Sequence, residues 1–203
     1  MKTGDILLFE GPDSSVFSRN IKRGQKLAGH EHYQFSHVGM FLESKDFEFL
    51  QGYPNVVFES TTMNTAKDVI VGSKISGVSV VAFDERMKGQ TVSVRRWEMP
   101  SATRRRMIAR TQGFVKRMHG VGYENDPGEL LKSALPWESL TEEEDLERAF
   151  CSELVYAFLE CAGIINPTLR KANSQCPAEI AGLSDWGLAR NVKILPIEDI
   201  KHG

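Results

Sequence analysis

The first half of the chain carries short apolar runs with a two-residue repeat, which is typical of β-strands. Ile6–Phe9 is continuously apolar and follows a Gly-Asp turn, so it predicts a short buried strand. Alternate residues of Ser36–Leu42 are apolar, which predicts a second strand with His37 on the opposite face. Val56–Ser60 predicts a third strand. Glu59 lies within this strand, among residues that are otherwise suited to burial.

The segments around these strands are less regular. Residues 10–35 predict a long loop, or a loop with a short helix, and this segment includes the basic stretch Arg19–Lys26. Ser79–Phe83 and Thr91–Trp97 predict a hairpin that turns around Lys88-Gly89. Consecutive strands with short links indicate an antiparallel meander or a half-closed barrel.

The second half of the chain changes to a helical period. Apolar residues recur at helical spacing between Ser101, a good N-cap, and Gly120, a plausible helix stop. Thr141–Glu144 resembles a capping box and predicts a short acidic helix or turn. A second amphipathic helix is predicted from Cys151 to Gly163, and Val192–Leu195 predicts a final extended segment.

Length and composition favour one domain. The chain has 203 residues, of which 41% are hydrophobic and 26% charged, and these values are ordinary for a globular protein. We therefore expect a single α+β domain over residues 1–203, with an antiparallel sheet or half-barrel packed against the cysteine-bearing helix. The net charge of −2 argues against nucleic acid as the main partner. No apolar run is long enough to predict a transmembrane helix.

The N-terminal apolar run is too short for a signal peptide, so we expect a cytoplasmic protein, or a periplasmic or secreted one if a signal has been removed. Cys151, Cys161 and Cys176 lack CxxC spacing, so neither a disulfide framework nor a structural zinc site is expected. The loop histidines His30 and His32 lack a carboxylate or thiolate at ligand spacing. We expect no metal and no cofactor.

Cys151 is the first candidate for chemistry, because it stands at the predicted start of an amphipathic helix. Free backbone N–H groups and the helix dipole favour an anion at that position. A thiolate stabilised in this way is a nucleophile. The alternative is a small buried cysteine that packs the helix start, which is common for free cysteines.

A cysteine nucleophile needs a base and a group that orients the base. His37 is the best base, since it lies on a strand face away from the apolar side chains, with Gly39 beside it. Glu59 is the best orienting group, because a carboxylate inside a strand is costly unless it is paired. Alternatively, His37 is a satisfied histidine on a sheet, and Glu59 faces solvent or pairs with Arg95 or Arg96.

The ordered set of motifs resembles the circularly permuted NlpC/P60 group of papain-like cysteine enzymes, of the YiiX/YaeF type. The resemblance spans nearly the whole chain in the right order, although each piece is short. The matching pieces are Gly4-Asp5-Ile6-Leu7-Leu8-Phe9, Ser36-His37-Val38-Gly39-Met40, Phe58-Glu59-Ser60, Gly122-Tyr123, Cys151-Ser152-Glu153-Leu154-Val155 and Cys176-Pro177-Ala178-Glu179.

This resemblance implies a papain-like fold in which the histidine and carboxylate strands precede the cysteine helix. It implies Cys151 as nucleophile, His37 as base and Glu59 as the orienting residue, with Tyr123 near the substrate. The implied activity is that of a thiol hydrolase, an amidase or cysteine peptidase, that cleaves an amide bond through a cysteine acyl-enzyme. Cell-wall-type peptides are the substrate class that the resemblance suggests.

Two other functions fit the same sequence. The first is an acyltransferase or a lipid (thio)esterase, whose basic stretches Arg19–Lys26 and Arg104–Arg106 meet lipid head groups at a membrane surface. The second is a non-enzymatic ligand-binding module with the same fold. The expected partner is a peptide or an acyl-bearing small molecule, and the sequence leaves the oligomeric state open.

Overall fold

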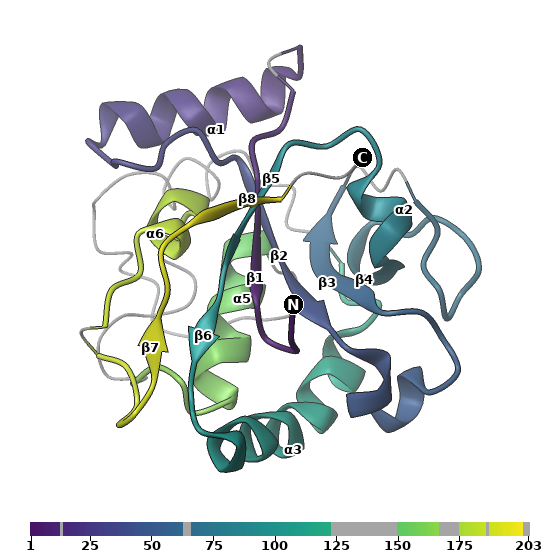
Figure 1. The fold of residues 1–203 in the computed structure, drawn as a ribbon. Coiled ribbons are helices and arrows are strands. Elements are labelled where there is room, and N and C mark those ends of the chain that lie inside the picture. The colour runs from purple at the N-terminus through teal and green to yellow at the C-terminus, as the bar shows by residue number, and fades with distance from the viewer. Residues whose placement is uncertain (13, 63–65, 123–149, 167–174, 186, 201–203) are drawn as a thin grey trace.

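An antiparallel six-stranded sheet forms the centre of the protein in a computed structural model that describes residues 1–12, 14–62, 66–122, 150–166, 175–185 and 187–200. Its strand order is β4-β3-β2-β1-β5-β8 (Figure 1). The strands are β1 (Ile6–Phe9), β2 (His37–Leu42), β3 (Val56–Thr61), β4 (Gly77–Ala82), β5 (Val92–Arg95) and β8 (Glu198–Ile200). A second, two-stranded sheet pairs β6 (Trp97–Glu98) with β7 (Lys193–Ile194).

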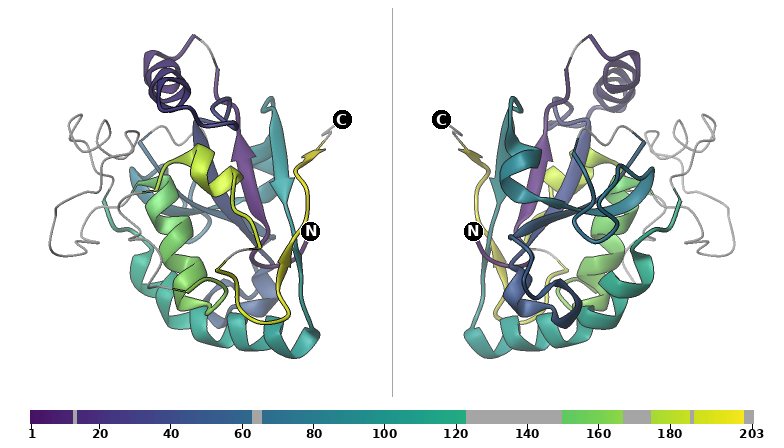
Figure 2. Two further views of the ribbon diagram at one scale, coloured as in Figure 1. Left: turned by 90° about the vertical axis from the view of Figure 1, so that its left-hand side faces the viewer. Right: turned by 90° about the vertical axis from the view of Figure 1, so that its right-hand side faces the viewer.

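Helices lie on both faces of the large sheet and at its two ends. The face that carries Val38 and Met40 packs against α3 and α5, and the opposite face packs against α2 (Figures 1 and 2). The helix α1 lies at one end of the molecule and α3 at the other. The helices are α1 (Val16–Leu27), α2 (Phe83–Met87), α3 (Ser101–Met118), α5 (Cys151–Cys161) and α6 (Pro177–Ala181), with short 3₁₀ turns at Ser44–Asp46 and Glu48–Leu50.

The predicted alternation of side chains in the first strands is confirmed. Val38, Met40 and Leu42 lie in the larger core, whereas Phe41 lies in the smaller core on the other face. Three phenylalanine rings link sheet and helices in the larger core, with centroids 6.1 to 6.5 Å apart. These are Phe58, Phe114 and Phe158.

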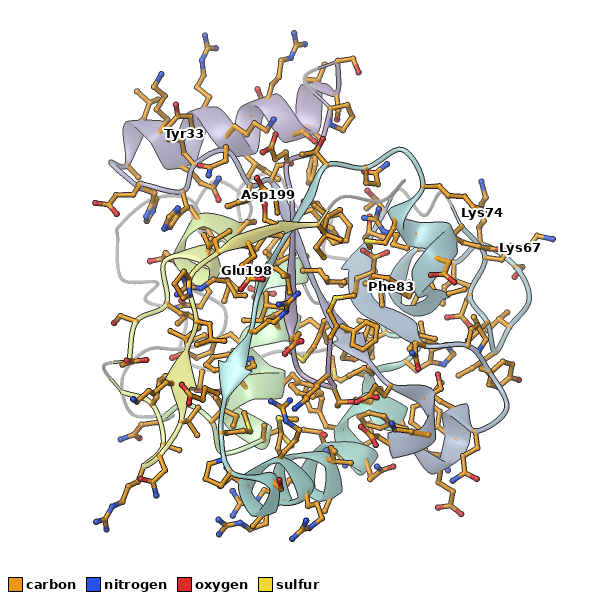
Figure 3. All side chains as sticks on the ribbon, in the orientation of Figure 1. Tyr33, Lys67, Lys74, Phe83, Glu198 and Asp199 are labelled. Carbon is orange, nitrogen blue, oxygen red and sulfur yellow. The ribbon has the colours of Figure 1, made fainter. Side chains whose placement is uncertain are left out.

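The predicted hairpin between residues 79 and 97 is wrong. β4 pairs with β3 at one edge of the sheet, and β5 pairs with β1 on the other side of β2. The connecting residues form α2, whose Phe83 (labelled in Figure 3) and Met87 are buried in the smaller core. Burial of these two side chains carries the chain across the face of the sheet, which a tight turn at Lys88-Gly89 could not do.

Three other segments differ from their predictions in detail. The segment 10–35 contains the twelve-residue helix α1, whose start is capped by the Ser15 hydroxyl that accepts from the Ser18 N–H. Pro100, not Ser101, is the N-cap of α3. The sequence missed β8, because a three-residue edge strand with two acidic side chains has no apolar pattern. Among the described helices, none is long and apolar enough to cross a bilayer.

Candidate functional site

Cys151 is the first residue of α5, as the sequence predicted. The helix start is fixed locally, because the Glu153 carboxylate accepts from the Phe150 N–H at 2.9 Å. The helical ladder begins at once, since the Leu154 N–H donates to the Phe150 carbonyl at 3.0 Å. Cys151 is 5% exposed, so its thiol sits in a largely dry environment at the helix N-terminus.

His37 and Glu59 meet across two neighbouring strands. In the antiparallel register of β2 and β3, Phe41 lies opposite Val57, which places Gly39 opposite Glu59 and His37 on the diagonal. The His37 Nε2 and Glu59 Oε2 atoms are 2.6 Å apart. Glu59 is fully buried, so its predicted solvent-facing alternative is wrong. The carboxylate therefore fixes the orientation of the imidazole ring.

Gly39 permits this close approach of the two strands. A Cβ atom at position 39 would lie 3.0 Å from Val57 Cγ1 and 3.2 Å from Glu59 Cβ, which is tighter than ordinary contact. The space that the sequence assigned beside His37 is thus filled by β3 itself. The glycine brings the Glu59 side chain within reach of the imidazole.

Arg86 is a further member of the site, and the sequence reasoning missed it. Its Nε donates to Glu59 Oε1 at 2.6 Å, and its guanidinium carbon lies 4.1 Å from the centroid of the Phe9 ring. The sequence offered only a weak signal, because Arg86 stands between Phe83 and Met87 in a helix of five residues. Those two apolar side chains turn this face of α2 toward the sheet.

The arginines that the sequence offered for Glu59 bind elsewhere. Arg95 donates to the Leu183 carbonyl, and Arg96 pairs with Glu198 at 2.7 Å. Neither arginine pairs with Glu59, because both lie at or just after the end of β5. Two strands, β2 and β1, separate β5 from β3 in the sheet.

His37 also interacts with the Cys151 thiol, so the structure brings the three predicted residues together. Burial alone lowers the pKa of His37, but the charge and hydrogen bond of Cys151, followed by those of Glu59, raise it to about 9. Burial raises the pKa of Glu59, yet Arg86 and His37 together lower it to about 2.

The other two cysteines have different surroundings. Burial, with the nearby charge of Glu179, raises the pKa of the Cys176 thiol to about 12. Its sulfur lies 3.7 Å from His30 Nε2. Burial also raises the pKa of Cys161. Both side chains are therefore protonated thiols at neutral pH.

A cleft of about 160 Å³ opens beside the His37 and Arg86 side chains. Its other walls come from the loop after β1, from the first turn of α1 and from the end of β3. They are Phe9, Gly11, Pro12, Ser15, Phe17, Ser18, Ser36, Thr61 and Gln90. A larger cavity of about 390 Å³ lies between the loop at 29–32 and α6, near Cys176. We assign the chemistry to the smaller cleft, because the His37 and Arg86 side chains line it.

Tyr123, which the resemblance places near the substrate, lies outside the described residues. Within the described part of the chain, no three His, Cys, Asp or Glu side chains gather closely enough to hold a metal ion. No protein-family model, curated protein or solved structure matches this chain. The family suggested by the motifs therefore stays a prediction.

Proposed function

We propose that the protein is a thiol hydrolase that cleaves an amide or ester bond through an acyl-enzyme on Cys151. The observation that carries this proposal is the single connected array of thiol, imidazole, carboxylate and guanidinium. Cys151 raises the pKa of His37 through its charge and a hydrogen bond, Glu59 lies 2.6 Å from His37, and Arg86 donates to Glu59. A nucleophile, a base and a carboxylate that orients the base are the arrangement that such catalysis uses.

Acylation proceeds by attack of the Cys151 thiolate on the substrate carbonyl carbon. A sulfur–carbon bond forms, and the negative charge moves to the carbonyl oxygen, where the Cys151 backbone N–H is the natural first donor. His37, as imidazolium, donates its proton to the leaving amine or alkoxide as the carbon–heteroatom bond breaks. Neutral His37 and a thioester remain.

Deacylation reverses the role of His37. The neutral imidazole takes a proton from water, whose oxygen attacks the thioester carbonyl. The carbon–sulfur bond breaks, the acid product leaves, and the thiolate–imidazolium pair is restored. Glu59 stays ionised throughout, because the Arg86 guanidinium and His37 hold its pKa at about 2. Its role is to orient and stabilise the imidazolium.

We further propose that the domain is a permuted papain-like fold of the NlpC/P60 type. The element order supports this assignment, since the strands that carry His37 and Glu59 precede the helix that carries Cys151. An amide bond in a peptide is the substrate that the resemblance favours. An ester or thioester of a lipid is the second candidate, because a basic and apolar helix, α1, borders the cleft.

The proposed function is tested with p-nitrophenyl acetate as a small activated acyl donor. Wild-type protein should gain one acetyl group, located on Cys151 by peptide mass spectrometry, and release p-nitrophenol. Cys151→Ala should lose both signals with its circular dichroism unchanged. Cys161→Ala is the matched control and should behave as wild type, since burial keeps that thiol protonated.

Equal acetylation of all three cysteines, or full turnover by Cys151→Ala, would contradict the proposal. That result would favour the non-enzymatic binding module, in which the array has only a structural role.

A further inference from the structure

The helix α1 lies at one end of the molecule, away from the main body of the sheet (Figures 1 and 2). One side of it is fixed to the domain by the buried Gln25. The Gln25 amide nitrogen donates to the Phe35 carbonyl at 2.8 Å, and its amide oxygen accepts from the Ala178 N–H at 3.0 Å. These bonds tie α1 to the start of β2 and to α6, so the helix has a defined orientation.

The other side of α1 faces solvent and has an unusual composition. Arg19, Arg23 and Lys26 are exposed there, and α1 contains no acidic residue, although the whole chain has a net charge of −2. Val16 is 62% exposed and Leu27 is 81% exposed on the same side of the helix. Nitrogen-ended side chains extend outward from α1, and Tyr33 lies next to it (Figure 3).

We propose that this outer face of α1, formed by Val16, Arg19, Arg23, Lys26 and Leu27, docks the protein on an anionic lipid surface. The three cations would meet the lipid head groups, and the two aliphatic side chains would enter the interface. Basic residues between exposed aliphatic ones are the pattern of a helix that lies in the plane of a membrane.

The exposed aliphatic side chains decide between possible anionic partners. A nucleic acid offers phosphates but gives Leu27 and Val16 no apolar surface to contact. A bilayer offers both, because anionic head groups lie directly above acyl chains. Four of the eight large hydrophobic side chains that are exposed among the described residues belong to this region, Val16, Phe17, Leu27 and Tyr33.

Docking through α1 would also bring the cleft to the membrane. Phe17 and Ser18 of α1 line the same cleft as His37. If the proposed hydrolase activity holds, its substrate would be an acyl compound held in the bilayer, such as a lipid ester or amide. This consequence rests on the proposed function, whereas the docking itself does not.

The test is co-sedimentation with vesicles of phosphatidylcholine, with or without phosphatidylglycerol. Wild-type protein should bind only the vesicles that contain phosphatidylglycerol, and high salt should weaken the binding. Arg19→Gln/Arg23→Gln/Lys26→Gln should lower the partition constant roughly 100-fold. Val16→Ser/Leu27→Ser should lower it at least about 10-fold.

The matched control removes three exposed cations from α3, at the other end of the molecule, as Arg105→Gln/Arg106→Gln/Lys116→Gln. This variant should bind as wild type. Equal binding of the α1 charge variant and wild type, loss of binding in the α3 variant, binding to a DNA duplex but not to vesicles, or no vesicle binding would overturn the proposal.

Two further measurements separate this proposal from the proposed function. Cys151→Ala should bind vesicles as wild type does, because docking needs no catalysis. The α1 charge variant should still hydrolyse p-nitrophenyl acetate at the wild-type rate, because that ester is soluble.

Discussion

At the scale of single residues, the site depends on how Glu59 tolerates complete burial. An isolated carboxylate in that position would be protonated or would destabilise the fold. Glu59 instead receives a 2.6 Å bond from Arg86 and another 2.6 Å contact from His37, one at each oxygen. The guanidinium also packs on the Phe9 ring. Arg86 is thus a positioning residue, which acts on His37 through Glu59.

Glu59→Gln should reduce the free energy of unfolding by about 3 kcal/mol at pH 6, because it leaves the Arg86 guanidinium, whose side chain is only 11% exposed, without its anion. Urea denaturation measures the difference. The matched control is Glu198→Gln, which breaks a surface ion pair with Arg96. The nitrogen–oxygen distance in that pair is 2.7 Å, similar to the distance between Arg86 and Glu59. That pair is about half exposed, so the control should change by less than about 1 kcal/mol.

The loss caused by Glu59→Gln should itself depend on pH. The pKa of Glu59 falls from 4.5 to about 2 on folding, so its stabilisation is complete above pH 4.5 and disappears as pH falls through 2. The pKa of His37 rises from 6.5 to about 9, so its contribution is complete below pH 6.5 and disappears as pH rises through 9. A difference between the two proteins that stays constant from pH 5 to pH 2 would contradict the pairing of Glu59.

At the scale of elements, the continuous apolar run of β1 and the two-residue period of β2 and β3 made these strands predictable from the sequence. Alternate residues of each strand lie in the two cores on opposite faces of the sheet, so the pattern and the fold agree. The link between β4 and β5 was not predictable, because α2 has only five residues. Its two apolar side chains, Phe83 and Met87, form a helical face only when they pack on the folded sheet. Arg86 was missed for the same reason.

Gly39→Ala tests the contact between β2 and β3. The added methyl group would meet Val57 and the Cβ of Glu59, so the strands must move apart by a few tenths of an ångström. We expect a loss of about 1–3 kcal/mol in urea denaturation and a fall in the pKa of His37 by NMR. Gly113→Ala, at an exposed position of α3, is the control and should raise stability by up to about 1 kcal/mol. An unchanged His37 pKa in Gly39→Ala would show that Gly39 does not set this geometry.

At the scale of the whole molecule, the site exists only because distant segments converge. β2, β3, α2 and α5 each contribute one member of the array, β1 contributes the Phe9 ring that packs on Arg86, and α1 forms a wall of the cleft. The sequence could nominate Cys151, His37 and Glu59, because each residue type was unusual in its local pattern. It could not show that the three meet, because spatial convergence is a property of the sheet order and of the helix packing.

The central claim is that Cys151 and His37 form a coupled pair in the folded protein. NMR titration of the His37 ring carbon-bound protons, in wild type and in Cys151→Ala, tests this claim most directly. We predict that His37 titrates near pH 9 in wild type, and at a clearly lower pH in Cys151→Ala because that variant lacks the thiolate. Cys161→Ala should leave the titration unchanged. A wild-type value near the ordinary 6.5, or the same value in Cys151→Ala, would contradict the claim.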